Sequence, residues 1–473
     1  MKILMVASEA TPYAKTGGLA DVIGALPAAL ASRGEQVAVI MPLYREAAGR
    51  LQSAERVYAD MPIPIGTHVR TVNIWGIVDR GVQFFFVDDP PLYDRAALYT
   101  EAGVDYPDNP LRFAVLCRAA LGAVRSLFRP HVIQYHDWQG SLVAPLIRRR
   151  FAADPTFYGI KLLFTIHNLG YQGIFPRTVL SDVGLGADLF HPDAMEFHNE
   201  INFLKGGIVF ADAINTVSRG YAREIQTPEL GFGLEGLLQR RSDVLCGIVN
   251  GVDYLEWSPE NDRYIAAPYS REDLSGKAEC KRDLLRTFRL PEERANLPLI
   301  GMVSRFVSQK GFDLVAEITP ELVKKDVSIV GIGTGEPQYE EMFQSLSRGH
   351  PEKVSIRIGY DNEIAHKIEA GSDIFLMPSR YEPCGLNQIY SLRYGTVPVV
   401  RATGGLDDTI DEETGFKFTE YSGTALLDAV GAALETYADR ARWMAMMRTG
   451  MEKDFSWGAS AAEYIALYRR LAA

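Results

Sequence analysis

The stretch that decides the fold covers residues 373–408 and reads DIFLMPSRYEPCGLNQIYSLRYGTVPVVRATGGLDD. After Asp373 comes an apolar run at 374–377, which ends at a proline and is followed by a short polar loop. From Gly385 on, apolar residues recur at helical spacing, and a second apolar run at 397–400 leads into the turn Thr403-Gly404-Gly405-Leu406. The order of strand, loop, helix, strand, turn and helix is typical of a parallel sheet.

This stretch also contains the first candidate ligand site. In parallel sheets, ligands bind at the carboxyl ends of the strands, where both loops of the stretch lie. The start of the helix at Gly385 offers unpaired backbone N–H groups and the positive end of a dipole, which favour a phosphate. Glu382 lies in the same loop, and because its carboxylate only accepts hydrogen bonds, it suits hydroxyl groups. A phosphate beside several hydroxyls describes a nucleotide sugar.

A second copy of the turn lies near the start of the chain. Lys15-Thr16-Gly17-Gly18-Leu19-Ala20-Asp21 resembles residues 403–408, and each segment follows a strand-like run and precedes a helix-like one. We therefore predict two doubly wound α/β domains, each directing a Gly-Gly turn at a shared deep cleft. Two ordinary tight turns are the alternative, because Gly-Gly pairs are common in turns of every kind.

Composition limits the function. The chain has 473 residues, of which 47% are hydrophobic, enough for two large domains or three smaller ones. Its formal net charge of −11 argues against a nucleic-acid binder, because such proteins rely on cationic contacts to phosphate. The four cysteines are scattered without a Cys-x-x-Cys pair, which indicates a reducing compartment. The eight histidines form no ligand motif, so we predict no bound metal and no cofactor.

No segment of the sequence predicts a membrane anchor. The N-terminal MKILMVASEA has an apolar run too short for a signal peptide, and Glu9 follows it directly, so a first strand fits better. No apolar run approaches the ~20 residues that span a bilayer. We expect a soluble, cytoplasmic protein, and the lack of a transit-like extension favours a bacterial cytosol.

Two strands of the first half end in polar residues. The strand predicted at 131–135 is followed by His136-Asp137-Trp138, and the strand predicted at 161–166 is followed by His167-Asn168. Because the carboxyl ends of parallel strands meet at one edge of a sheet, we expect these side chains at the same site. The alternative for each histidine is a hydrogen-bonded residue at the end of a strand, which is common.

The segment at 88–109 has no periodicity and is rich in proline, tyrosine and aspartate. A loop of this length in a compact domain is usually functional or mobile. Tyr93, Tyr99 and Tyr106 are candidates to stack on sugar rings, with Tyr99 the first choice, and local packing is the equal alternative.

The second half repeats the alternation of strands and helices, with strands predicted at 299–304, 328–332, 354–358, 373–377 and 397–400. The first of these ends in a loop with Arg305 and Lys310. Arginine as a fork and lysine as a point charge form a natural clamp for a diphosphate, and a solvated surface pair is the alternative. We place the two domains at 1–242 and 243–456, with a helix at 457–473 that returns to the first.

Together these segments resemble the bacterial and plastid glycogen and starch synthases, retaining glucosyltransferases of the two-domain, Rossmann-like glycosyltransferase-B fold. The resemblance covers essentially the whole chain. Its most specific segments lie at 15–21, 136–138, 166–168, 304–311 and 382–386. Asn387 departs from the pattern, because the family usually has threonine there.

The resemblance implies ADP-glucose as the donor and the non-reducing end of an α-1,4-glucan, such as glycogen, as the acceptor. It assigns to catalysis Asp137, His167, Arg305, Lys310 and Glu382, with the two cations on the diphosphate and Asp137 nearest the reacting centre. It assigns to the donor site also Lys15, Gly17, Gly18, Asn168, Cys384, Gly385, Leu386, Thr403 and Gly404. On the acceptor side it places Glu9, Tyr99 and Trp138.

Two other functions stay open. One is a transferase of the same fold that uses UDP-glucose, because only the resemblance favours adenine. The other is a non-catalytic glucan-binding protein, although the residues whose loss would mark one are all present. For the transferase, retention is compatible with a carboxylate nucleophile such as Asp137 and two inversions. The resemblance instead favours front-face substitution, in which the leaving phosphate takes the proton of the acceptor.

Overall fold

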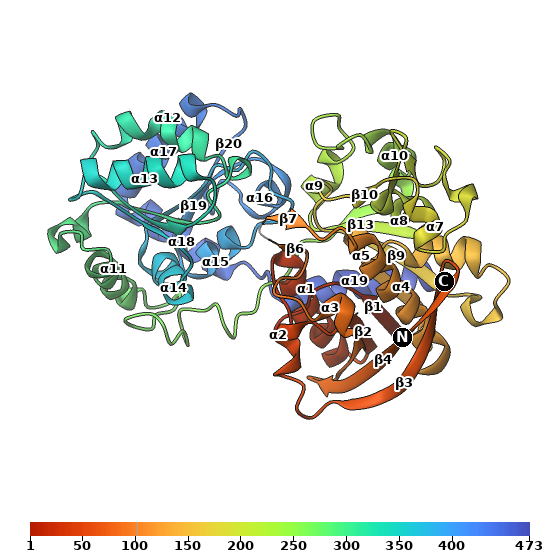
Figure 1. The fold of residues 1–473 in the computed structure, drawn as a ribbon. Helices are drawn as coiled ribbons and strands as arrows, with labels where there is room; N and C mark the ends of the chain where they lie inside the picture. The colour runs from red at the N-terminus through yellow and green to blue at the C-terminus, as the bar shows by residue number, and fades with distance from the viewer. Residues whose placement is uncertain (102) are drawn as a thin grey trace. The chain divides into compact units, whose positions relative to one another are not determined.

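The computed structural model describes residues 1–101 and 103–473, which form two compact units (Figure 1). Unit 1 comprises Met1–Val217, Ala222–Gly251 and Trp457–Ala473, and unit 2 comprises Ser218–Tyr221 and Val252–Ser456. Each unit is a sheet of mainly parallel strands with helices packed on it, so the chain has the predicted class of two doubly wound α/β domains. The domain boundaries expected from the sequence, with domains at 1–242 and 243–456 and a final helix at 457–473, stay a prediction. The compact units place residues 243–251 with the first unit.

Unit 1 is built on a nine-stranded sheet in the order β14-β13-β9-β8-β1-β2-β5-β4-β3. The strands from β14 to β5 run parallel, and β4 and β3 extend the sheet as an antiparallel ribbon. The central strands are buried along almost their whole length, because both of their faces are covered. The strands are β1 Lys2–Val6, β2 Gln36–Pro42, β3 Glu55–Ile65, β4 His68–Asp79, β5 Val82–Asp88, β8 Val132–His136, β9 Lys161–Ile166, β13 Ala213–Thr216 and β14 Leu245–Gly247.

The strand order of unit 1 has a topological switch point between β1 and β8. From β1 the chain continues to β2 on one side, whereas β8 pairs later on the other side. Val6, the last residue of β1, pairs with Ile40 and with Tyr135, so the carboxyl ends of these strands lie level. Ligands of open α/β sheets bind at such a point, which makes the segments after β1 and β8 the first place to look for a site.

The helices of unit 1 are mostly short, apart from α1 and α4 on the sheet and α19 at the C-terminus. They are α1 Gly18–Ser32, α2 Arg45–Ala48, α3 Pro90–Tyr93, α4 Asn109–Ser126, α5 Asp137–Gly140, α6 Val143–Pro145, α7 Val179–Asp182, α8 Phe203–Phe210, α10 Glu235–Arg240 and α19 Trp457–Ala472, and α9 Arg219–Glu224 has residues in both units. Two small sheets add β6 Thr100–Glu101 with β7 Val104–Asp105, and β10 Ile174–Phe175 with β11 Glu196–Phe197 and β12 Glu200–Asn202.

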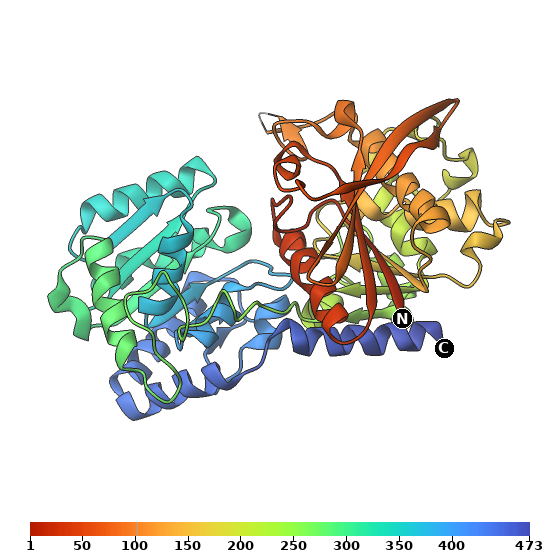
Figure 2. The ribbon, with the colours of Figure 1, turned by 90° about the horizontal axis from the view of Figure 1, so that it is seen from below.

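The last helix, α19, belongs to unit 1 and lies against α1 (Figure 2). The guanidinium of Arg33, at the end of α1, donates to the carbonyl of Gly458 at 2.7 Å. Further along α19, the buried hydroxyl of Tyr468 donates to the side-chain carbonyl of Gln134 on β8. The C-terminus of the chain therefore contributes to the packing of the first sheet.

Unit 2 is built on a parallel sheet in the order β17-β16-β15-β18-β19-β20. Its strands are β15 Leu299–Val303, β16 Ser328–Gly333, β17 Val354–Ile358, β18 Ile374–Met377, β19 Val397–Arg401 and β20 Phe416–Phe418. Its helices are α11 Ser275–Thr287, α12 Phe312–Leu322, α13 Pro337–Gly349, α14 Asn362–Gly371, α15 Asn387–Arg393, α16 Gly404–Thr409, α17 Gly423–Ala438 and α18 Arg440–Glu452.

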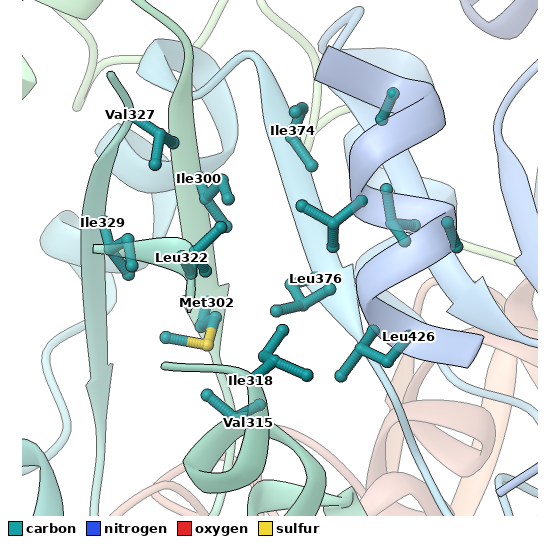
Figure 3. Packing of buried hydrophobic residues seen from close by; sticks show 14 of the residues in the cluster. Ile300, Met302, Val315, Ile318, Leu322, Val327, Ile329, Ile374, Leu376 and Leu426 are labelled. Atoms are coloured by element: carbon teal, nitrogen blue, oxygen red, sulfur yellow. The ribbon is translucent and has the colours of Figure 1, made fainter. Parts of the chain in front are cut away.

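A continuous hydrophobic core fills one face of this second sheet (Figure 3). Ile300 of β15, Leu376 of β18 and Leu426 of α17 point into it, together with side chains of α12. Full burial of one such side chain stabilises the folded state by about 1.5–3 kcal/mol. The core therefore fixes the positions of the strands, and with them the loops at the carboxyl ends of the strands. The chain winds from β15 to β17 on one side and from β18 to β20 on the other. The switch point of unit 2 therefore lies between β15 and β18.

Two segments of unit 1 differ from what the sequence predicted. β3 is an edge strand whose side chains are mostly exposed, and it contains Pro62 and Pro64, so it lacks the apolar pattern of a central strand. The segment at 88–109, expected to be irregular, contains α3 and the strands β6 and β7. Among the described residues, no helix is both long enough and apolar enough to cross a membrane.

Candidate functional site

Glu9 is the organising residue at the carboxyl end of β1. Its side chain is buried and accepts four hydrogen bonds, although it was expected on the acceptor side. Three of these bonds come from the glycine loop. The donors are the backbone N–H groups of Thr16 and Gly17 and the hydroxyl of Thr16, which lies 2.6 Å from the carboxylate. The phenol of Tyr99 donates to it at 2.6 Å and also lies 2.8 Å from the hydroxyl of Ser8. Glu9 therefore fixes the glycine loop and Tyr99 relative to each other.

The loop that Glu9 holds presents Lys15 and two glycines on the surface. The ammonium of Lys15 lies 2.6 Å from Asp21 in the first turn of α1, and its side chain is 54% exposed. A Cβ added at Gly17 or at Gly18 would meet no atom within 4 Å. Gly17 has an extended backbone with φ −154°, so neither its conformation nor packing requires glycine. The two glycines instead leave bare backbone, as expected where a ligand approaches closely.

Asp137 follows directly after β8 and has an unusual backbone. Its φ of +50° lies in the left-handed region, which is strained for a residue other than glycine and is found more often at functional sites. Its carboxylate accepts a hydrogen bond of 2.7 Å from the backbone N–H of His167, which follows β9. Burial raises the pKa of Asp137 to about 7, against the effect of the His167 and Asn168 N–H groups, which lower it. The strand ends of β8 and β9 are thus joined at this residue.

A pair of histidines lies beside Asp137. Nδ1 of His136 is 3.0 Å from Nε2 of His167, and the two rings are tilted by 37°. Burial lowers the pKa of His136 well below its usual range and that of His167 to about 3, so both rings are neutral at physiological pH. Asn168 turns its side-chain oxygen back to the N–H of Gly170 at 2.9 Å, which shapes the loop after β9.

Several aromatic residues expected at the site are buried within unit 1. Trp138 is 9% exposed and packs edge-on against Phe113 and Phe175, at centroid distances of 4.9 and 5.6 Å. Tyr93 is fully buried and Tyr106 nearly so, and local packing, not stacking on a sugar, therefore explains these two tyrosines of the 88–109 segment. Trp138 thus packs within unit 1, and the acceptor role expected for Glu9, Tyr99 and Trp138 stays a prediction.

In unit 2, the loops after β15 and β18 bring a cation and a carboxylate together. The ammonium of Lys310 lies 2.5 Å from Oε2 of Glu382, and their side chains are only 19% and 8% exposed. The hydroxyl of Ser379 donates to the same oxygen at 3.2 Å. Arg305 is exposed, and within the described ranges its guanidinium has neither an ion-pair nor a hydrogen-bond partner. A free guanidinium five residues before a held ammonium is an arrangement that can bind a diphosphate.

Backbone contacts join these two loops of unit 2. Gly311 has φ +75°, and a Cβ there would lie 2.0 Å from the carbonyl oxygen of Pro378, so only glycine fits. The N–H of Arg380 donates to the carbonyl of Gln309 at 2.8 Å. The sequence GFD after Lys310 therefore closes the loop against the end of β18, which is why Lys310 reaches Glu382.

The second Gly-Gly turn is under a packing constraint that the first does not share. Gly404 has φ +46°, and a Cβ there would lie 2.0 Å from the carbonyl oxygen of Glu382. At Gly405 a Cβ would lie 2.1 Å from the carbonyl oxygen of Cys384, and the N–H of Gly405 donates to the backbone carbonyl of Glu382 at 3.1 Å. Thr403 and Cys384 are both buried in this contact. The two turns are thus alike in sequence and in their place before a helix, but only the second one needs glycine for the fold.

The helix expected to begin at Gly385 begins two residues later. Gly385 has φ +70°, Leu386 precedes the first turn, and α15 covers only Asn387–Arg393. The side-chain amide of Asn387 donates to the carbonyl of Val303 at 2.7 Å, which ties the start of α15 to the end of β15. Asparagine at this position, where the family usually has threonine, thus has a clear structural role. The anion contacts expected at the helix start and at Arg305 and Lys310 stay predictions.

Each unit therefore gathers the expected residues at its own switch point. Sequence reasoning missed Asp21, the partner of Lys15, and Ser379, which supports Glu382. Asp21 shared the quoted motif, and Ser379 lay in the quoted loop, but short polar residues in turns carry no specific signal. Among the described residues, no group of three or more His, Cys, Asp or Glu side chains has the arrangement of a metal site.

Comparison with known proteins follows the same division of the chain. The family model described as the starch synthase catalytic domain matches residues 2–240, and that described as glycosyl transferases group 1 matches residues 287–448. The chain is 51% identical to the glycogen synthase of Koribacter versatilis, over 99% of this chain and 98% of that protein. It is 50% identical to the glycogen synthase of an Anaeromyxobacter species, over the full length of both.

Solved structures show the same architecture. The catalytic domain of starch synthase IV from Arabidopsis thaliana, bound to ADP and acarbose, superposes with a TM-score of 0.90 at 32% identity, covering 99% of each chain. Sucrose-phosphate synthase from Thermosynechococcus elongatus shares the fold with a TM-score of 0.61 at 18% identity, covering 99% of this chain and 98% of that one. Sequence, family models and fold agree, and the chain belongs to the glycogen and starch synthase family of glycosyltransferases with the glycosyltransferase-B fold.

Proposed function

We propose that this protein transfers glucose from ADP-glucose to the non-reducing end of an α-1,4-glucan, with retention at the anomeric carbon and release of ADP. The observation that carries the proposal is the pair of Lys310 and Glu382 at the switch point of unit 2. A cation and an acceptor-only carboxylate match the two chemical halves of a sugar diphosphate. The glycogen synthases that resemble the chain over its full length support the choice of glucan as the acceptor.

The donor site is proposed to divide its tasks among few residues. Arg305 and Lys310 hold the diphosphate, and Glu382 accepts hydrogen bonds from the glucose hydroxyls. Lys15 reaches the donor from the loop that Glu9 organises, where Gly17 and Gly18 leave room for it. The remaining donor residues act through the shape of their loops, namely Asn168, Cys384, Gly385, Leu386, Thr403 and Gly404. The ADP in the starch synthase IV structure supports an adenine nucleotide.

The reaction is proposed to run by front-face substitution. The bond from the anomeric carbon to the diphosphate oxygen breaks, and the acceptor hydroxyl adds to the same face. Its proton goes to the leaving phosphate oxygen, so ADP and a lengthened glucan are the only products. The largest contribution of the protein is then the stabilisation of negative charge on the departing diphosphate by Arg305 and Lys310.

Asp137 has a supporting part in this mechanism. A carboxyl group with a pKa of about 7 is half ionised at neutral pH, and its ionised form can stabilise positive charge without forming a covalent bond. Its oxygen is also engaged by the N–H of His167. We therefore assign Asp137 to orienting the strand end and to electrostatic support of positive charge at the anomeric carbon.

The acceptor is proposed to bind on unit 1 near the ends of β8 and β9. Tyr171 is 61% exposed, and its backbone N–H donates to the carbonyl of Asn168 at 3.3 Å. An exposed aromatic ring beside a polar site suits stacking on a sugar ring. Tyr99, Trp138 and Glu9 support this surface from below, through the packing and hydrogen bonds described above.

One assay tests the proposal and separates it from its rivals. Glucose incorporation into glycogen is measured with ADP-glucose and with UDP-glucose as donors, with and without EDTA. We expect ADP-glucose to be used in preference and EDTA to have no effect, since we propose no metal. Preference for UDP-glucose would assign another donor, and absence of incorporation with tight glycogen binding would indicate the non-catalytic alternative.

A further inference from the structure

The histidine pair beside Asp137 contains a residue that the mechanism does not yet use. His136 is the last residue of β8 and is completely buried. Its Nδ1 lies 3.0 Å from Nε2 of His167, so one hydrogen bond joins the two rings. Because both rings are neutral, a single proton occupies the space between these nitrogens, and it belongs to one ring or the other.

The two arrangements differ in what His167 offers on its free side. If His136 donates from Nδ1, then Nε2 of His167 is the acceptor and His167 carries its own proton on Nδ1. If His167 donates from Nε2, its Nδ1 is a bare acceptor, and His136 must carry its proton on Nε2. The hydrogen bond to His136 therefore decides whether His167 presents a donor or an acceptor to a ligand.

The surroundings of His136 favour the first arrangement. Its Nε2 is buried and, in the part of the chain that the structure describes, has no hydrogen-bond partner. A buried N–H without an acceptor is among the rarest defects in folded proteins, so Nε2 is better left as a bare lone pair. Nδ1 of His167 also lacks a partner among residues 1–101 and 103–473, and that side chain is partly exposed. In this arrangement the N–H group that is free to bind a ligand is Nδ1–H of His167, on the partly exposed ring.

We propose that His136 is a positioning residue that holds His167 as the Nδ1–H tautomer, so that His167 donates a hydrogen bond to an oxygen of the substrate. The inference rests on the proposed function only for the identity of that oxygen, which belongs to the sugar or the phosphate of the donor. The tautomer itself is a property of the free protein.

The first test reads the tautomer directly. The full-length protein is labelled with ¹⁵N-histidine and studied by NMR at pH 7.5 without substrate, and the signals of His167 are identified by their loss in His167→Gln. Protonated and unprotonated ring nitrogens have well-separated ¹⁵N shifts. We expect Nδ1 of His167 to be protonated and Nε2 to be unprotonated. A proton on Nε2 would overturn the proposal.

The second test removes the donor and then restores it. His136→Val deletes the hydrogen bond, whereas His136→Asn keeps an N–H close to the position of Nδ1. We expect His136→Val to give a mixture of tautomers and to lower kcat/KM about tenfold, because only a fraction of the molecules is competent. His136→Asn should retain the single tautomer and most of the activity. A folded His136→Asn without the Nδ1–H tautomer, or a His136→Val that keeps it, would refute the positioning role.

Thr165→Val provides the matched control. Thr165 pairs with His136 between β8 and β9, and its hydroxyl donates to Asn215 at 2.6 Å. Its loss disturbs the same strands without removing a hydrogen bond of either ring, so we expect lower stability with an unchanged tautomer of His167. Because the NMR result needs no substrate, a failure of the proposed donor or acceptor would leave it standing, and the two failures can be told apart.

Discussion

The two Gly-Gly turns allow a paired test, because the same substitution should have opposite effects in them. In Gly404→Ala, the residue keeps φ +46°, which costs about 1–2 kcal/mol with a side chain. The new Cβ also lies 2.0 Å from the carbonyl of Glu382, and relieving such overlap costs typically about 1–3 kcal/mol. Together these terms amount to roughly 2–5 kcal/mol, or a loss of about 5–15 °C in the Tm of unit 2.

Gly18→Ala should behave in the reverse way. Gly18 is the first residue of α1, and its Cβ would meet no protein atom within 4 Å. Alanine is a better helix former than glycine, so the stability of unit 1 should be unchanged or higher by up to about 1 kcal/mol. If the donor approaches this bare backbone, one methyl group in its path should raise KM for ADP-glucose about 10–200-fold.

Calorimetry and steady-state kinetics on both variants decide the matter. Gly404→Ala should have a lower Tm than the wild type. Gly18→Ala should have the Tm of the wild type but a raised KM for ADP-glucose. A stable Gly404→Ala would refute the packing argument. A Gly18→Ala with normal KM, or one that is destabilised, would refute the assignment of the first turn to ligand binding.

Three further changes have defined outcomes. Arg305→Ala should lower kcat by about 10²–10³-fold without loss of stability, the scale for one donor to a developing anion; a near-normal kcat in a glycogen transfer assay would argue against it. Tyr171→Ala should raise KM for glycogen more than KM for ADP-glucose in the same assay, and an equal change in both would count against an acceptor surface at that ring. The raised pKa of Asp137 means that its contribution to stability is present below a pH of about 4 and is lost as pH rises through 7. Urea unfolding should therefore show the wild type losing roughly 2–3 kcal/mol relative to Asp137→Asn between pH 5 and pH 8, and a difference that does not change with pH would contradict the raised pKa.

The fold could be predicted from the sequence where one local pattern sufficed. β1, β9 and β18 are short apolar runs that end in polar residues or proline, and such runs have few alternatives to a buried parallel strand. The edge strand β3 could not be found in this way, because most of its side chains face solvent and it contains two prolines. Its place depends on pairing with β4, which only the assembled sheet supplies.

The site could be predicted as a set of residues but not as a set of interactions. The strand-end rule located Glu9, Asp137 and Glu382 correctly at switch points, because it depends only on topology. The sequence does not show that the Glu9 carboxylate accepts hydrogen bonds from the glycine loop. Nor does it show that Glu382 pairs with Lys310, since this contact joins two loops that are distant in the chain. Likewise, TGGL at 403–406 and at 16–19 look the same, and only tertiary packing distinguishes their glycines.

The central claim is that Arg305 and Lys310 hold the diphosphate of the donor. It is tested most directly by calorimetric titration of ADP into the wild type, Arg305→Ala, Lys310→Ala and the control Lys324→Ala, whose exposed ammonium pairs with Glu321 on α12. We predict that each of the first two substitutions weakens ADP binding at least about tenfold, as expected for a lost charge-assisted hydrogen bond, and that the control binds as the wild type. Equal affinity for ADP in all four proteins would contradict the account.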